Sequence, residues 1–125
     1  LAPTPRLGGY DGLCQDGANG LTDLLALSDT TLLALERGCL VNTRTRQVHN
    51  SAQVFEVSLE GADDVFGRVS LREGATPRTV RKRRVLDIRK LEDRLSPALA
   101  RLENFEGLAF GPAPPGHAGR TVLVL

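Results

Sequence analysis

The segment TDLLALSDTTLLALER (22–37) contains two short apolar runs separated by four polar residues, 28–31. A connector of this length between apolar runs indicates a β-hairpin. Both runs are apolar almost throughout instead of alternating, which is typical of strands that are covered on both faces. Charge returns abruptly at Glu36 and Arg37, where the second run ends. The segment therefore predicts paired strands near 22–27 and 32–36 in an all-β domain.

Other parts of the chain add four strands and one helix. In QVFEVSL (53–59), Glu56 and Ser58 alternate with apolar residues, which predicts a half-exposed strand. Further strands are predicted near 84–88, 106–110 and 121–125. A helix is predicted around 90–102, because one helical face there gathers apolar residues: Leu91, Leu95, Ala98, Leu99 and Leu102.

Composition excludes some classes of function. The 125 residues carry 16 Lys+Arg against 15 Asp+Glu, a formal charge of +1, so no strong field attracts nucleic acid. The basic run within 78–84 is interpreted as a solvated, edge-protecting stretch, because only one Tyr, four Phe and no Trp are present for base stacking. No apolar run approaches the ~20 residues of a membrane-spanning helix. Cys14 and Cys39 form a disulfide or stay unpaired; both alternatives remain open.

The two ends of the chain differ from its middle. Residues 1–20 are rich in Gly, Pro, Asp and Asn, and are interpreted as a turn-rich lead-in. The chain contains no Met, and it stops within the apolar run RTVLVL (120–125). We therefore expect a piece of a larger protein, truncated at its C-terminus.

A repeated pattern connects the middle of the chain to its end. DLLALSD, beginning at Asp23, and EGLAFGP, beginning at Glu106, each place an acid before a short apolar run with Ala at the same position. The two segments are 83 residues apart, close to twice the roughly 40–45-residue period of a four-stranded propeller blade. This offset favours a β-propeller-like fragment of about two to three blades with one short helical insertion.

In a propeller, the acids at the strand entrances would lie close to one another. Inner strands of a propeller converge on a central channel, so the entrances of equivalent strands come together. Carboxylates gathered there repel one another unless a cation or a shared proton offsets their charge. Oxygen ligands of this kind suit Ca²⁺ or Mg²⁺. The sequence thus predicts a divalent cation near the strand entrances.

Three segments in order, TDLLALSDTTLLALERG (22–38), TPRTVRKRRVLDI (76–88) and LENFEGLAFGP (102–112), carry a family resemblance. The chain from about residue 21 to 125 resembles the phytase-like domain family, "esterase-like activity of phytase". The resemblance implies a secreted or periplasmic β-propeller protein that acts on phosphorylated small molecules as a phosphodiesterase-like or phytase-like hydrolase. The family's acidic loop would follow Leu125, so we expect this chain to need the rest of its propeller and to be inactive alone.

The same resemblance assigns candidate roles. Glu36 and Glu106 are predicted as catalytic acid/base groups or metal ligands, and Asp23 as a further metal ligand. Arg37 and Asn104 are predicted to bind substrate, since a guanidinium matches two phosphate oxygens. Two alternatives remain: Glu36 and Arg37 only form an ion pair that closes a hairpin, or the whole domain is a non-catalytic propeller that binds protein or glycan.

Overall fold

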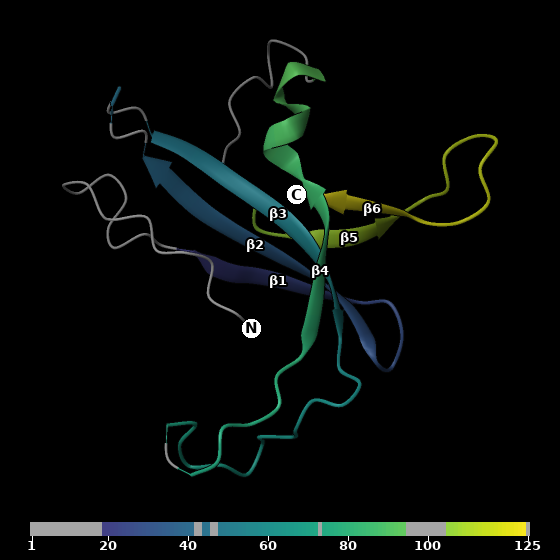
Figure 1. The fold of residues 1–125 in the computed structure, drawn as a ribbon. Coiled ribbons are helices and arrows are strands. Elements are labelled where there is room, and N and C mark those ends of the chain that lie inside the picture. The colour runs from purple at the N-terminus through teal and green to yellow at the C-terminus, as the bar shows by residue number, and fades with distance from the viewer. Residues whose placement is uncertain (1–18, 42–43, 46–47, 73, 95–104, 125) are drawn as a thin grey trace.

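The computed structural model describes residues 19–41, 44–45, 48–72, 74–94 and 105–124, which form two antiparallel sheets and one 3-10 helix (Figure 1). The larger sheet has the strand order β1-β2-β3-β4 and the smaller one pairs β5 with β6. The bounds are β1 Gly20–Ala26, β2 Thr31–Val41, β3 Val48–Ser58, β4 Arg81–Asp87, the helix η1 Ile88–Arg94, β5 Leu108–Gly111 and β6 Thr121–Val124. The fold is all-β and propeller-like: a four-stranded meander, as in one blade, is followed by a hairpin.

All six predicted strands are present, with some bounds changed. β2 and β3 are longer than predicted, because they pair continuously from Thr31 opposite Ser58 to Val41 opposite Val48. Only the first part of the predicted helix lies among the described residues, and there it is the 3-10 helix η1. Cys14, Asn104 and nearly all of the turn-rich lead-in lie outside the described residues. In the described part of the chain, no helix is long and apolar enough to cross a membrane.

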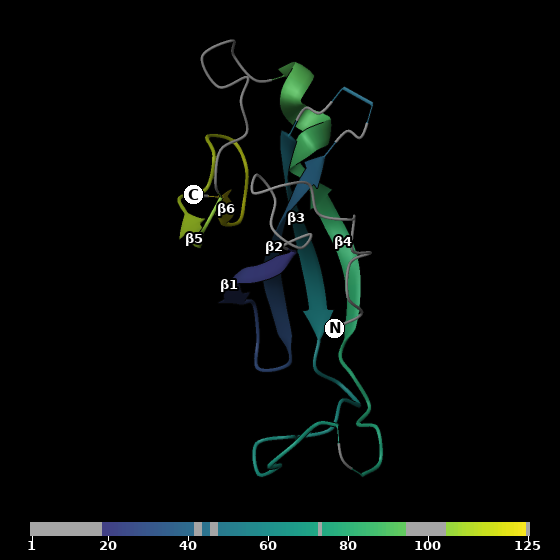
Figure 2. The same ribbon diagram turned by 90° about the vertical axis from the view of Figure 1, so that its left-hand side faces the viewer.

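The core lies between the larger sheet and the β5–β6 hairpin. Its buried members come from both sheets and from η1: Leu33, Leu35, Ala52, Val54, Ile88 and Leu108. Phe105 and Val124 pack against this cluster from the hairpin side. Figure 2 shows the hairpin beside the larger sheet, not in line with its strands. Burial of apolar side chains on this face thus holds the two sheets together.

The face of the larger sheet that points away from the β5–β6 hairpin is buried on some strands and exposed on others. Ala34 and Val57 are buried there, at 0% and 3% exposure, so β2 is covered on both faces as predicted. The predicted half-exposed β3 holds near its end, where Val57 is 3% exposed and Glu56 41%, but it fails at Val54, which lies on the same face as Glu56 and is buried. The edge strand β1 leaves Leu21 and Leu24 exposed, so the expectation of two covered faces fails for β1.

A β-bulge orients the start of β1. The pairing of β1 with β2 shifts register between Leu21 and Asp23, while Thr22 Oγ1 donates a hydrogen bond of 3.1 Å to the Leu35 carbonyl. Beyond the bulge, Asp23 lies opposite Leu35, and directly opposed residues share a face of the sheet. The bulge therefore turns the Asp23 carboxylate toward the face on which β5 packs.

The long connection between β3 and β4, residues 59–80, is closed at its base by Asp63 and Arg78. Arg78 donates its backbone N–H to Asp63 Oδ2 and its Nε–H to Oδ1, both at 2.9 Å. The Asp63 N–H in turn donates to the Arg78 carbonyl at 3.0 Å. We call these two residues the loop neck.

The loop neck is expected to weaken in acid. The hydrogen bond from the Arg78 backbone N–H, and then that from its side chain, lower the pKa of Asp63 below its ordinary 3.8. Because the folded-state pKa is depressed, the stabilisation is present above the ordinary value and is lost as the pH falls through the lowered pKa. Amide hydrogen exchange in 64–72 should therefore accelerate, relative to the strands, below about pH 3.8. Asp63→Asn should show the faster exchange already at neutral pH; identical exchange in both proteins at all pH values would contradict this role.

Candidate functional site

The two repeated strand entrances meet in the structure. β1 and β5 are in contact, and the Leu108 N–H donates a hydrogen bond of 2.7 Å to Asp23 Oδ2 across the two sheets. The other Asp23 oxygen, Oδ1, accepts the Leu24 N–H at 2.8 Å. A carboxylate that accepts two backbone N–H groups is well satisfied without a metal ion. Asp23 therefore fixes the first residue of β5 against β1.

Glu106 and Arg37 form an ion pair beside this junction. Arg37 Nη1 lies 3.0 Å from Glu106 Oε1, and the two side chains are 36% and 65% exposed. Arg37 extends from β2, whereas Glu106 precedes β5 by two residues. An exposed pair of this kind contributes at most about 1 kcal/mol to stability. Its position at the junction of two sheets, open to solvent, makes it available to a ligand.

Glu36 has a different environment from its neighbour Arg37. Consecutive residues of a strand point to opposite faces, and Glu36 meets Lys82 of β4 with both oxygens, at 2.7 and 2.9 Å. These two side chains are only 12% and 17% exposed, and Lys82 Nζ also lies 4.3 Å from the centre of the Phe55 ring. Removal of either partner would leave a charge largely excluded from water. The contact therefore ties β4 to β2 across β3.

The three predicted acids thus have separate partners: Asp23 accepts backbone N–H groups, Glu36 pairs with Lys82 and Glu106 pairs with Arg37. Within the described residues, no three His, Cys, Asp or Glu side chains come close enough to hold a metal ion. Asp23, Glu36 and Glu106 therefore do not form one shared cation site within the part of the chain that the structure describes. The predicted Ca²⁺ or Mg²⁺ stays a prediction.

Sequence reasoning did not predict that the basic run within 78–84 forms ion pairs with carboxylates of the same chain. Each cation of the run has a carboxylate partner within the chain, in the pairs Arg78 with Asp63, Arg81 with Glu60, Lys82 with Glu36, Arg83 with Glu56, and Arg84 with Asp87. Most of these side chains are exposed at an edge strand, as predicted, but Lys82 is not. Lys82 lies opposite the buried Val57 and therefore shares its face of the sheet. The alternation of side chains along β4 is the sequence signal that could have shown that Lys82 points inward.

Comparison with known proteins gives one match. A family model described as "Phytase-like: Esterase-like activity of phytase" matches residues 2–125. No curated protein and no solved structure matches the chain.

Proposed function

The chain belongs to the phytase-like family, and we propose that it is a phosphoester hydrolase-like propeller domain whose reacting groups are Arg37 and Glu106. The observation that carries this proposal is the exposed ion pair of these two residues, at the point where the larger sheet meets the β5–β6 hairpin. Phosphorylated small molecules are the proposed substrates. A secreted or periplasmic location is proposed with them, on the family resemblance alone.

The chemistry of the pair suits a phosphoester. A guanidinium carries five N–H donors, and Glu106 engages Nη1, so further donors can bind two oxygens of a phosphate group. Glu106 lies beside that position. As a general base, its carboxylate takes a proton from a water molecule as the water oxygen attacks phosphorus, and the proton then passes to the departing alkoxide. The products are a phosphate and an alcohol.

The remaining predicted residues have supporting parts in this proposal. Asp23 positions Glu106, because it holds the Leu108 N–H two residues further along the chain. Glu36 keeps β4 in place through Lys82 and does not face the reacting pair. Asn104 remains a proposed substrate contact. Calcium or magnesium remains a proposed cofactor, and no step above passes through it.

Arg37→Gln is expected to raise the KM for phytate or a simple phosphodiester by roughly tenfold, because a charge-assisted hydrogen bond is worth about 1.5–3 kcal/mol. The glutamine keeps a polar side chain but loses the positive charge. Arg83→Gln is the matched control, since Arg83 also forms an exposed ion pair, with Glu56 at 3.0 Å. Steady-state hydrolysis assays compare the three proteins, each together with the rest of the propeller that the chain is expected to need. An unchanged KM in Arg37→Gln, or no hydrolysis of either ester by the wild-type protein, would overturn the proposal.

A further inference from the structure

The strand that borders the proposed site begins with a glycine. Gly20 of β1 lies directly opposite Arg37 of β2, and directly opposed residues share a face of the sheet with their Cβ positions roughly 4.5–5.5 Å apart. A side chain at position 20 would therefore stand against the Arg37 side chain, on the face where Arg37 meets Glu106. Gly20 itself is exposed. The lack of a side chain leaves this flank of the ion pair open.

No steric reason for glycine at position 20 is found in the described part of the chain. A Cβ at Gly20 would meet no atom of the described residues within 4 Å, and the backbone there is not left-handed. Gly38 is different, because a Cβ at that position would overlap Asn19 Oδ1. A glycine within a strand is destabilising, because it has more conformational freedom to lose on folding than any other residue. Packing therefore explains Gly38 but not Gly20.

The two flanks of Arg37 differ in the room that they leave. On β3, Arg37 lies opposite Ala52, which is 2% exposed and belongs to the core cluster. On β1, Arg37 lies opposite Gly20, where the space is open. A phosphoester held by the Arg37 guanidinium therefore has room for its alcohol part on the Gly20 side and not on the Ala52 side.

We propose that Gly20 is a specificity-determining residue of this site, and that the open space over it accepts the alcohol part of a bulky phosphoester. The inference rests on the proposed function of Arg37 and Glu106 and adds a substrate class to it. A side chain at position 20 would exclude a wide alcohol such as a ring, whereas a narrow ester would still reach Arg37. The effect of a substitution at Gly20 is therefore on the affinity for bulky esters.

Isothermal titration calorimetry tests the inference on the chain together with the rest of its propeller. Cyclohexyl phosphate and isopropyl phosphate are matched probes, because both are esters of a secondary alcohol and differ in the bulk of that alcohol. Gly20→Val should raise the Kd of cyclohexyl phosphate by roughly tenfold and that of isopropyl phosphate by less than about twofold, since only the ring needs the space that valine fills. The variant should melt no lower than the wild type, because valine favours strands and meets no described neighbour here.

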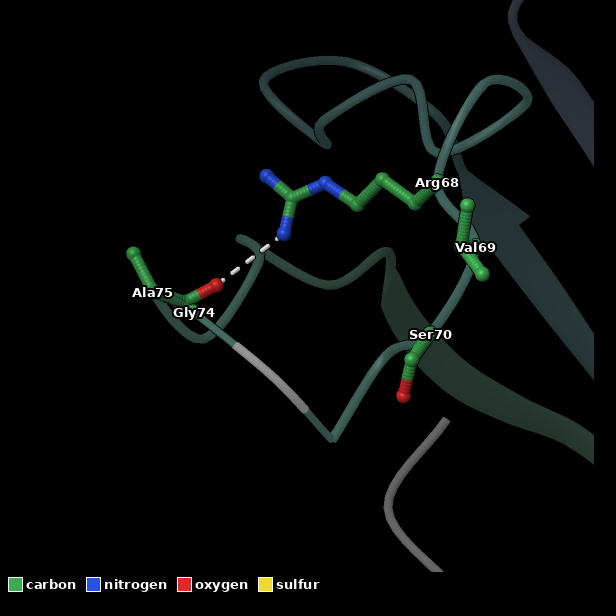
Figure 3. Close-up of a pocket in the computed structure, with 5 residues that line it drawn as sticks. All are labelled: Arg68, Val69, Ser70, Gly74 and Ala75. Atoms are coloured by element: carbon green, nitrogen blue, oxygen red, sulfur yellow. Dashed lines mark hydrogen bonds between the residues drawn. The ribbon is translucent and has the colours of Figure 1, made fainter.

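Gly67→Val is the matched control. Gly67 also has open space at its Cβ position and no left-handed backbone, and it precedes another exposed arginine, Arg68. The Arg68 side chain crosses the shallow pocket of the loop between β3 and β4, and its Nη1 donates to the Ala75 carbonyl at 3.0 Å (Figure 3). This loop extends away from the β5–β6 hairpin (Figures 1 and 2). Gly67→Val should therefore leave both Kd values unchanged.

The outcomes separate this inference from the proposed function. Wild-type affinity for cyclohexyl phosphate in Gly20→Val would overturn the inference and leave the hydrolase proposal intact. An equal rise in Kd for both esters would do the same, because valine would then disturb Arg37 itself, as would an equal effect of Gly67→Val. Binding of the esters without hydrolysis would contradict the proposed chemistry and keep the role of Gly20. If the wild type binds neither ester, both proposals fail.

A smaller substitution covers the case in which valine disturbs the strand. If Gly20→Val melts well below the wild type, Gly20→Ala decides the question, because alanine adds a single methyl group. It should raise the Kd of cyclohexyl phosphate about threefold more than that of isopropyl phosphate, a smaller effect than that of valine because less of the space is filled. Equal Kd ratios in Gly20→Ala and the wild type would then overturn the inference.

Discussion

Leu35→Ala is expected to lower the free energy of unfolding by about 3–5 kcal/mol, which is the cost of removing a large side chain from a closed core. Leu35 is 0% exposed and is the largest fully buried side chain in the described part of the chain. It lies on the central strand β2, opposite Val54 of β3, in the cluster that also contains Leu108 of β5. Truncation would therefore leave a cavity where the two sheets meet.

Leu24→Ala is the matched control for this substitution. Leu24 belongs to the neighbouring edge strand β1 and is 48% exposed, so the same truncation should cost less than about 1 kcal/mol. Urea unfolding of both variants measures the two changes. Equal losses would mean that the β5–β6 hairpin does not cover β2 as the structure shows.

The strands were predictable because each apolar run is long enough to mark an element by itself. Their bounds were not, since pairing decides where a strand ends. Glu36 and Arg37 looked like the end of β2, yet the strand continues to Val41 because β3 supplies a partner for every residue. The failure of the β3 prediction at Val54 has a related cause. Sequence alternation shows which residues share a face, but it does not show what covers that face.

The candidate site was predictable in part. The 83-residue repeat singled out β1 and β5, and the structure places these strands in contact and joins them through Asp23 and Leu108. The donor that each acid meets could not be foreseen, because it lies far away in the sequence. Glu36 and Arg37 are neighbours, but their partners Lys82 and Glu106 are 46 and 69 residues distant and on opposite faces of β2. The acids were predicted to share a cation; the structure pairs each with its own donor.

Glu106→Gln is expected to lower kcat for phosphoester hydrolysis by about 100-fold or more, the usual contribution of a general base. Glutamine has nearly the same size and keeps an amide oxygen that can accept the Arg37 hydrogen bond, so the junction of the two sheets should persist. Because the ion pair is exposed, the free energy of unfolding should change by less than about 1 kcal/mol. The lower kcat would then result from the missing general base and not from unfolding of the protein.

Glu56→Gln provides the comparison. Glu56 also pairs with an arginine at 3.0 Å, but on β3 and away from the β1–β5 junction. The most direct test is the initial rate of phytate and phosphodiester hydrolysis by wild type, Glu106→Gln and Glu56→Gln, each together with the rest of the propeller and with its unfolding midpoint recorded. We expect Glu106→Gln to keep its midpoint and lose its rate, while Glu56→Gln keeps both. Wild-type rates in Glu106→Gln, or a loss of rate shared equally by the two variants, would contradict the assignment of Glu106 as the reacting base.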